Sequence, residues 1–189
     1  MQHAKIELSN SRFPTPISEE IWNMKYRLRD PDLVDAAGNT VPGTIHDVTV
    51  EDSWRRVAVA LAEAEAPDVR AEFAERFFEA LEDFKYLPAG RITAGAGPGR
   101  SVTLFNCFVM GTIPDSMDGI FDMLKEAALT MQQGGGIGYD FSTIRPKGTL
   151  VKGVGSDASG PLSFMDVWDA MCKTIMSAGS RRGAMMATM

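Results

Sequence analysis

The sequence predicts an α/β protein, with a helical N-terminal region followed by the first strands and helices of an α/β domain. An apolar run from Ser101 to Met110 precedes a helical stretch, a glycine cluster and a second apolar run, which is a β-α-β pattern. Residues 1–86 carry 17 acidic and 10 basic side chains, whereas residues 87–189 carry 8 and 9 and hold 16 of the 18 glycines. We therefore expect a helical region at residues 1–86 and an α/β region at residues 87–189, where small anions such as phosphates would bind.

Composition excludes several functional classes. The 189 residues are 44% hydrophobic and 23% charged, the balance of an ordinary globular protein. Two cysteines and two histidines are too few for a disulfide scaffold, a structural zinc site or a Ser-His-Asp hydrolase, so no metal site is predicted. No basic stripe with interleaved aromatic residues indicates nucleic-acid binding, and no apolar run is long enough to cross a bilayer. We expect a cytoplasmic protein with no membrane contact.

The first helix is expected to begin at Pro16 to Glu20. Ser18 can serve as its N-cap, and acidic residues suit the positive end of the helix dipole. The apolar spacing predicts that this helix ends near Arg29. Residues 30–48, which are rich in proline and glycine, are expected to form a loop.

Two more helices are expected before the glycine-rich part. Thr49 begins the second helix, and Asp52 three residues later completes a capping box in which Asp replaces the usual Glu. The third helix follows Pro67 and has phenylalanines on one face and glutamates largely opposite, which indicates a core stripe and a solvated face. The glycine-rich segment after Leu87 is either a flexible linker or a loop that approaches a ligand, and the sequence leaves both readings open.

The second region contains a series of elements that follow the first strand. Ser101 to Met110 lacks clean alternation, which predicts a parallel strand that is buried on both faces. The later expected elements are, in order, a helix at 117–133 that starts after Pro114-Asp115-Ser116, a strand at 137–141, a loop at 146–159 with a short strand at 150–151, and a helix from Gly160-Pro161 to Gly179. Because the chain ends in an apolar, strand-like run, we expect it to be part of a larger domain.

Five motifs, in this order and spacing, resemble the large catalytic chain of ribonucleotide reductases. They are Thr-Leu-Phe-Asn-Cys-Phe-Val (103–109), Asp-Ser-Met-Asp-Gly-Ile (115–120), Gly-Gly-Gly-Ile-Gly-Tyr-Asp-Phe-Ser-Thr-Ile-Arg-Pro-Lys-Gly (134–148), Ser-Gly-Pro-Leu-Ser-Phe-Met (159–165) and Ser-Arg-Arg-Gly-Ala-Met-Met (180–186). The likeness is greatest to the adenosylcobalamin-dependent subclass, which Pro-Ile-Ser-Glu-Glu-Ile-Trp-Asn-Met-Lys-Tyr-Arg at 16–27 also resembles.

The resemblance implies a fold and a reaction. The complete fold would be a ten-stranded α/β barrel behind the helical region, and this chain would hold only the first barrel strands. The complete enzyme would convert ribonucleotides to deoxyribonucleotides by thiyl-radical chemistry with adenosylcobalamin. Its partners would be the ribonucleotide substrate, a deoxynucleoside triphosphate effector, a thioredoxin-like or glutaredoxin-like reductant and a second copy of the chain. The radical-bearing cysteine of the family pattern is absent here, so we expect these 189 residues alone to be inactive.

The resemblance also implies roles for individual residues near the substrate. Cys107 matches the strand cysteine that supplies reducing equivalents at the ribose 2′ carbon and forms a disulfide with a later cysteine, which this chain lacks. Asn106 and Arg91 correspond to positions near the bound substrate. Cys172 lies away from these motifs, and we expect it to pack in the core.

Two further sets of residues correspond to regulatory positions. The effector site is matched by Asp115, Ser116, Met117, Gln132, Arg145 and Lys152. The loop that communicates between effector and substrate is matched by Ser177, Arg181, Arg182 and Gly183. A carboxylate at a helix start can accept hydrogen bonds from a nucleoside, and basic side chains can bind phosphates. The alternatives are that Asp115 is only an N-cap and that Arg145 is simply solvated.

Two other functions fit parts of the sequence. One is a stand-alone nucleotide-binding or regulatory module that keeps the effector surface without the chemistry. The other is a simple thiol redox protein, which is disfavoured because the usual Cys-X-X-Cys motif is missing.

Overall fold

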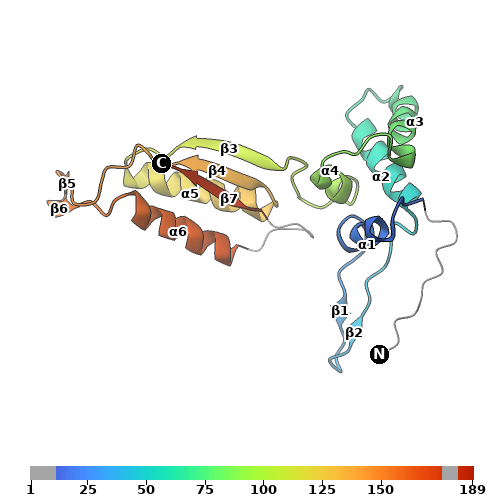
Figure 1. The fold of residues 1–189 in the computed structure, drawn as a ribbon, viewed down its shortest axis with the longest axis horizontal. Coiled ribbons are helices and arrows are strands. Elements are labelled where there is room, and N and C mark those ends of the chain that lie inside the picture. The colour runs from blue at the N-terminus through green and yellow to red at the C-terminus, as the bar shows by residue number, and fades with distance from the viewer. Residues whose placement is uncertain (1–11, 176–182) are drawn as a thin grey trace. The chain divides into compact units, whose positions relative to one another are not determined.

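The computed structural model describes residues 12–175 and 183–189, which form two compact units that divide between Gly99 and Arg100 (Figure 1). The first unit is helical, and the second combines parallel strands with helices, which confirms the predicted α/β class. The described strands form an open sheet and no closed barrel. Residues 87–99, which the composition grouped with the second region, belong to the first unit.

The first unit contains helices and one hairpin. Its helices are α1 (Pro16–Lys25), α2 (Val50–Ala62), α3 (Arg70–Leu81), a 3₁₀ turn (Glu82–Phe84) and α4 (Gly90–Gly95). The hairpin pairs β1 (Leu33–Val34) with β2 (Thr40–Val41) in antiparallel register. The expected loop at residues 30–48 therefore contains a hairpin. Asp35 builds its turn by accepting hydrogen bonds from the amides of Ala37 and Asn39, and Gly38 supplies the left-handed backbone.

The predicted start of the first helix is confirmed, because α1 begins at Pro16, but its predicted cap and its predicted end are wrong. Thr15 rather than Ser18 is the N-cap of α1, and its hydroxyl accepts a hydrogen bond from the amide of Ser18. The helix ends at Lys25, not near Arg29. The amide of Leu28 donates to Oδ2 of Asp47 at 3.1 Å, so a tertiary partner replaces the helical carbonyl and draws the chain out of the helix. By contrast, the capping box of Thr49 and Asp52 at the start of α2 is confirmed.

A buried polar network lies at the centre of the first unit. Oδ2 of Asp47 accepts hydrogen bonds from Ser53 Oγ at 2.6 Å and from Arg56 Nη2 at 2.8 Å, and Trp22 Nε1 donates to Ser53 Oγ at 2.9 Å. Burial raises the pKa of the Asp47 carboxyl group, but the hydrogen bonds from Arg56, Ser53 and the Leu28 amide lower it by more, so the pKa lies below its usual value. Asp47 is therefore held as a carboxylate inside the unit.

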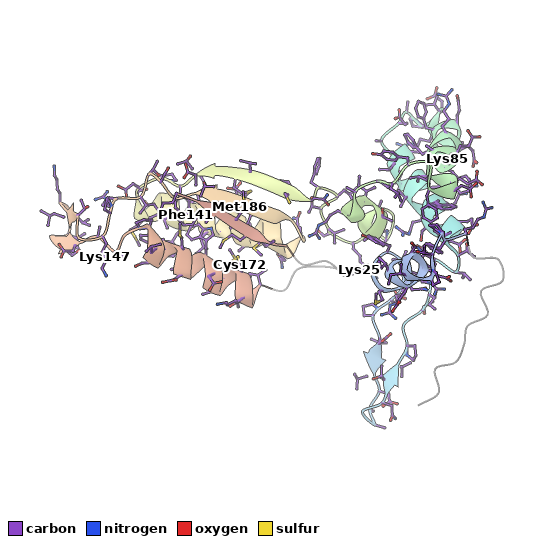
Figure 2. The ribbon with its side chains drawn as sticks, in the orientation of Figure 1. Lys25, Lys85, Phe141, Lys147, Cys172 and Met186 are labelled. Carbon is purple, nitrogen blue, oxygen red and sulfur yellow. The ribbon has the colours of Figure 1, made fainter. Side chains whose placement is uncertain are left out.

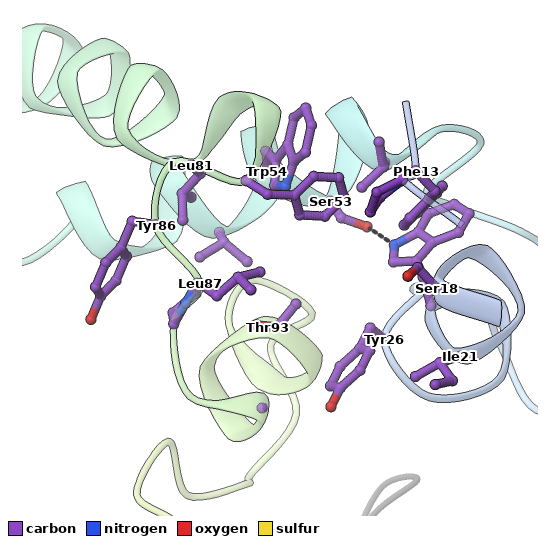
Figure 3. Close-up of a pocket in the computed structure, with 17 residues that line it drawn as sticks. Phe13, Ser18, Ile21, Tyr26, Ser53, Trp54, Leu81, Tyr86, Leu87 and Thr93 are labelled. Atoms are coloured by element: carbon purple, nitrogen blue, oxygen red, sulfur yellow. Dashed lines mark hydrogen bonds between the residues drawn. The ribbon is translucent and has the colours of Figure 1, made fainter. Parts of the chain in front are cut away.

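Arg56 extends this network to the segment after Leu87. Its guanidinium also donates to the carbonyl oxygens of Ala96, Thr93 and Tyr26. These bonds tie α2 to α4, which is why the glycine-rich segment belongs to the helical unit rather than forming a free linker. An apolar cavity of about 420 Å³ lies beside the network, with aromatic side chains such as Trp54, Tyr26 and Tyr86 in its wall (Figure 3).

The second unit is a three-stranded parallel sheet with two helices. The strands β3 (Cys107–Thr112), β4 (Gly136–Asp140) and β7 (Met185–Thr188) lie in the order β3-β4-β7. The helices are α5 (Met117–Gln132) and α6 (Pro161–Thr174), and a hairpin pairs β5 (Leu150–Val151) with β6 (Ser156–Asp157). Figure 1 shows α5 and α6 alongside the sheet. The predicted β-α-β unit is confirmed by β3, α5 and β4.

The core of this unit is apolar. Its largest fully buried side chains include Trp168 of α6, Tyr139 and Phe141, and the last is labelled in Figure 2. Burial, together with the nearby charge of Glu126, raises the pKa of Tyr139 to about 12, and its hydroxyl donates to the carbonyl of Met123 at 3.0 Å. The phenol therefore keeps its proton and fixes β4 against α5.

Two expectations for this unit differ from the structure. The first strand was expected to be buried on both faces, but β3 is an edge strand that pairs only with β4 among the described strands, and Val109 is 97% exposed. Burial of a strand depends on which strands and helices flank it, and the strand's own composition does not reveal that. The second difference is that α6 ends at Thr174, whereas the expected end at Gly179 lies outside the described residues.

Candidate functional site

A cavity of about 390 Å³ in the second unit brings together residues from three parts of the chain. Asp115, Ser116 and Met117 at the start of α5 form one wall, Arg145 follows β4, and the β5–β6 hairpin closes the other side. Four of the six residues predicted for the effector site therefore line one cavity. The other lining side chains are apolar, such as Ile120, Ile144 and Phe164 together with Val151 and Val154, or polar, namely Ser156, Asp157 and Ser159.

The start of α5 is capped by Ser116 and not by Asp115. Ser116 Oγ accepts a hydrogen bond from the amide of Gly119 at 3.2 Å. Glycine suits position 119 because a Cβ atom there would lie 2.7 Å from Cβ of Pro114. The alternative in which Asp115 is only an N-cap is therefore wrong, and its carboxylate is available for another partner.

That partner is Arg145. Its Nε donates to Oδ2 of Asp115 at 2.8 Å, its amide donates to Oδ1 at 3.3 Å, and its Nη2 reaches the carbonyl oxygen of Asp115 at 3.3 Å. The two side chains are 36% and 32% exposed, so the pair stands at the rim of the cavity. Arg145 is therefore not simply solvated, and it is a charged group held at the mouth of a cavity with a partly apolar wall.

This arrangement suits a ligand with a charged end and an apolar, flat end. A guanidinium binds phosphate oxygens through charge-assisted hydrogen bonds, and the apolar wall can cover a nucleobase. The cavity volume lies within the range that holds small molecules.

Two predicted effector residues do not line this cavity. Lys152 lies in the turn of the β5–β6 hairpin and is exposed, although its neighbours Val151 and Val154 line the wall. Gln132 is the last residue of α5 and stands roughly 22 Å along the helix from Met117, given about 1.5 Å per residue. Within one chain, the structure does not bring Gln132 to the cavity.

Cys107 begins β3 with an exposed thiol and faces Gly136 on β4. A Cβ atom at Gly136 would lie 3.1 Å from Sγ of Cys107, so the glycine leaves room for the sulfur. The carbonyl of Asn106 accepts a hydrogen bond from the Gly136 amide at 2.9 Å and fixes the backbone beside the thiol. Arg91, the other predicted substrate residue, lies on α4 in the first unit.

Most of the predicted specificity loop lies outside the described residues, which applies to Ser177, Arg181 and Arg182. Gly183 is described, and a Cβ atom there would lie 2.3 Å from the carbonyl oxygen of Gly135. Only glycine permits this approach of two backbones, so the end of the loop is held against the glycine cluster that precedes β4.

Cys172 of α6, labelled in Figure 2, packs against the core as expected. Its Sγ lies 3.3 Å from Sδ of Met131 and 3.7 Å from Sδ of Met185. Burial, and then the nearby Asp169, raises the pKa of the Cys172 thiol, which keeps it protonated and less reactive. The two methionine contacts were not predictable from the sequence.

Over residues 12–175 and 183–189, no group of three His, Cys, Asp or Glu side chains is placed to hold a metal ion. In the same part of the chain, no helix has the length and apolar character needed to cross a membrane.

Comparison with known proteins identifies the family. A family model described as the ribonucleotide reductase all-alpha domain matches residues 39–101, and one described as the ribonucleotide reductase barrel domain matches residues 105–189. The chain belongs to the ribonucleotide reductase large-chain family. The helical first unit therefore corresponds to the all-alpha domain of this family, and the partial sheet of the second unit corresponds to part of its barrel domain.

Several curated reductases are similar to the chain. It is 36% identical over 138 residues to the vitamin B12-dependent ribonucleoside-diphosphate reductase of Mycobacterium tuberculosis, covering 73% of the chain and 20% of the relative. The protein of the same name from Thermoplasma acidophilum is 38% identical over 114 residues, covering 60% and 15%. The ribonucleoside-diphosphate reductase subunit alpha of Helicobacter pylori is 31% identical over 128 residues, covering 68% and 16%. The chain spans about a fifth or less of the length of these relatives.

Two of these relatives are named for vitamin B12, and the two cavities described above in this reductase chain do not have the size to enclose that group. A corrinoid with its nucleotide tail is larger than either cavity, of about 420 and 390 Å³. The wall of the larger cavity is mostly apolar and aromatic. We assign none of these residues to the corrinoid.

Proposed function

We propose that this chain is the N-terminal part of a ribonucleoside-diphosphate reductase, an oxidoreductase that converts ribonucleotides to deoxyribonucleotides in the cytoplasm. Family membership and the names of the relatives support this activity. We further propose adenosylcobalamin as the radical-generating cofactor of the complete enzyme, because two of the relatives are named as vitamin B12-dependent. These 189 residues are inactive alone in this proposal, since they lack the radical-bearing cysteine of the family pattern.

Cys107 is the redox-active thiol in this proposal. It and a later cysteine lose two electrons and form a disulfide, while the hydroxyl at the ribose 2′ carbon leaves as water and is replaced by hydrogen. A thioredoxin-like or glutaredoxin-like protein then reduces the disulfide. The exposed thiol at the start of β3, with the space left by Gly136, supports this role, and Asn106 and Arg91 are the proposed substrate contacts.

The cavity at Asp115 and Arg145 is the proposed effector site for a deoxynucleoside triphosphate. The observation that carries this proposal is the joint placement of Asp115, Ser116, Met117 and Arg145 around one cavity of about 390 Å³, which lies in the range of small-molecule sites. Lys152 on the adjacent hairpin is the proposed second phosphate contact. Gly183 and the loop before it form the proposed link between the effector site and the substrate site. The loop residues in this proposal are Ser177, Arg181 and Arg182.

A second copy of the chain is the proposed partner, with α5 at the interface. Met117, Phe121 and Leu129 of α5 are 60%, 46% and 54% exposed, which leaves apolar surface for a partner helix. Gln132 would then reach an effector from the opposite subunit. If two chains share the site, effector and dimerisation must tighten each other by the same factor.

The test of the redox assignment is Cys107→Ser in the complete enzyme, with Cys172→Ser as its matched control. Cys107→Ser should abolish multiple turnover and preserve nucleotide binding, and Cys172→Ser should retain turnover because Cys172 only packs in the core. Product formation with a dithiol reductant measures both. Normal turnover by Cys107→Ser would remove this residue from the chemistry. Binding of a deoxynucleoside triphosphate by a complete protein that never turns over would favour the regulatory-module alternative.

A further inference from the structure

We infer that the sulfur atoms of Cys172, Met131 and Met185 form a binding site for one soft monovalent metal ion, of the chemical class of Cu(I). The three residues come from α6, α5 and β7. Cys172 Sγ lies 3.3 Å from Sδ of Met131 and 3.7 Å from Sδ of Met185. The proposed reductase chemistry does not need this ion, so turnover and metal binding can be tested independently.

Hydrogen bonding alone does not use the sulfur lone pairs of this cluster. A thiol carries one weak S–H donor, and a thioether is only a weak acceptor. The Cys172 thiol therefore donates to one methionine at a time, although both thioether sulfurs lie beside it. A cation bound to all three sulfurs would engage the lone pairs that one proton leaves unpaired. Thiolate and thioether ligands are soft, and they select Cu(I) over the harder ions that oxygen ligands bind.

The cluster lies where two helices end. Met131 is the residue before the last in α5, and Cys172 lies in the last turn of α6. The unpaired carbonyls at a helix C-terminus carry partial negative charge, which favours a cation. Burial raises the pKa of the Cys172 thiol, and the carboxylate of Asp169 raises it further, so the field of Asp169 at this sulfur is negative. Lys173, which pairs with Asp169, has a side chain that is 74% exposed.

The sulfur atoms need only small movements to hold an ion. Bonds from thiolate sulfur to Zn²⁺, which like Cu(I) is a d¹⁰ ion, are about 2.3 Å long, so three sulfurs around one ion lie about 4 Å apart. The present separations of 3.3 and 3.7 Å are slightly shorter. Methionine has three rotatable bonds and adapts to such changes. Cys172 and Met185 are only partly buried, so an ion can reach the cluster from solvent.

Binding is a ligand exchange without electron transfer. The Cys172 thiol releases its proton to solvent, and its thiolate and the two thioether sulfurs form bonds to Cu(I) as the ion leaves the ligands that carried it. The single negative charge of the thiolate neutralises the single positive charge of the ion. A neutral centre avoids the free-energy cost of an unpaired charge at the edge of the core.

The experiment measures the Cu(I) affinity of the 189-residue chain against a coloured competing chelator, without oxygen and with ascorbate as reductant. Every protein carries Cys107→Ser, because the exposed thiol of Cys107 would bind Cu(I) by itself. This parent should bind one ion. Met131→Leu, Met185→Leu and Cys172→Ser should each weaken binding by more than about tenfold, which is the cost of losing even an outer hydrogen-bond partner of a metal ligand.

Met186→Leu is the matched control. Met186 follows Met185 in β7 and is labelled in Figure 2, but its side chain is 66% exposed, and successive residues of a strand face opposite sides of the sheet. This variant should bind Cu(I) as tightly as the parent. Leucine has nearly the volume of methionine, so each leucine variant should keep the fold. Unchanged affinity in Met131→Leu and Met185→Leu, or an equal loss in Met186→Leu, would overturn the inference.

Two further measurements distinguish this site from surface binding. X-ray absorption at the copper edge should show sulfur neighbours alone, and nitrogen or oxygen neighbours would contradict the three-sulfur site. Cu(I) should also raise the melting temperature of the parent and not that of Cys172→Ser, because the ion joins α5, α6 and β7 only in the folded state. If the parent binds Cu(I) no more tightly than Cys172→Ser does, the binding is adventitious and the inference fails.

Discussion

Each unit contains an arginine–aspartate pair that joins two elements of its fold, and these two pairs have the same length but different surroundings. Arg56 Nη2 and Asp47 Oδ2 lie 2.8 Å apart in the first unit, as do Arg145 Nε and Asp115 Oδ2 in the second. The side chains of the first pair are 10% and 4% exposed, and those of the second are 36% and 32% exposed.

This difference in exposure separates a structural pair from a pair that can serve a ligand. Arg56 also donates to three backbone carbonyls, so its donors are engaged by the protein and the pair cannot exchange partners without breaking the unit. Arg145 is bound on one side and reaches solvent on the other, so an incoming phosphate can be accepted while Asp115 stays in place. Similar ion-pair geometry thus gives a buried pair in one unit and an exposed pair at the rim of a cavity in the other.

The largest expected effect is on the stability of the first unit. Asp47→Ala leaves Arg56 as a buried charge without its carboxylate and should cost about 3 to 5 kcal/mol. Asp115→Ala, the matched change at the exposed pair, should cost at most about 1 kcal/mol. Amide hydrogen exchange, followed separately in α2 and α5, measures both. Equal losses would contradict the distinction between the pairs.

Acid should affect the same buried pair. The folded-state pKa of Asp47 lies below its unfolded value, so its carboxylate contributes stability above the unfolded pKa, near about 4. This contribution is lost as the pH falls through the lower folded-state pKa. The effect should be smaller than that of Asp47→Ala because the side chain remains. Urea unfolding of α2 from pH 6 downwards should show a decline that is absent in Asp47→Asn.

At the exposed pair the effect should be on binding. Arg145→Ala removes charge-assisted hydrogen bonds of about 1.5 to 3 kcal/mol and should weaken the effector by roughly ten- to a hundredfold. Lys152→Ala should weaken it less, because Lys152 stands on the hairpin turn outside the cavity wall. Calorimetry gives the affinities, and product ratios of the complete enzyme give the choice of base. Unchanged affinity and base preference in Arg145→Ala would remove it from the site.

Two glycines on β4 test the space beside Cys107. Gly136→Ala would place a Cβ atom 3.1 Å from Sγ of Cys107 and 3.3 Å from the Asn106 carbonyl, so we expect a loss of about 1 to 3 kcal/mol. Gly138→Ala meets nothing closer than 3.9 Å and should be neutral or stabilise by up to about 1 kcal/mol. Thermal melting compares the two variants. Equal melting temperatures would mean that the thiol does not need this space.

The smallest difference concerns the helix caps of the two units. Thr49 takes part in a reciprocal capping box, whereas Ser116 accepts one amide hydrogen bond. Thr49→Ala should therefore cost about 1 to 2 kcal/mol and Ser116→Ala about 0.5 to 1 kcal/mol. Hydrogen exchange at the first turns of α2 and α5 reports each loss. A larger loss at Ser116 would show that the cap of α5 has a further role.

Expectations that depended on neighbouring residues were mostly correct. The capping box at Thr49, the helix after Ser116 and the β-α-β order all follow from patterns a few residues long, and all three are present. The misplaced cap of α1 is a local error, since Thr15 and Ser18 are both good caps and only the geometry decides between them. The missed hairpin is similar, because a proline- and glycine-rich stretch suits a loop as well as a turn.

The candidate site was predictable in part. The motif order identified Asp115, Ser116, Met117 and Arg145, and the structure gathers these four at one cavity. The position of Lys152 outside the wall and of Gln132 at the far end of α5 was not visible, because a motif gives the order of residues and not their distances. Asp157 was missed altogether, since an isolated aspartate in a loop has no distinguishing pattern.

The sequence by itself determined the class of the fold, the order of its helices and strands, and the family to which the motifs belong. Those properties arise from side-chain periodicity, caps and glycine positions, which act over a few residues along the chain. Only the tertiary structure decided that Asp47 is buried with Arg56, that Asp115 is bonded to Arg145 across thirty positions, and that β3 pairs with β4 alone among the described strands. Such contacts form only when packing brings distant helices and strands together. They therefore depend on the packing of the whole unit and not on the residue type at any one position.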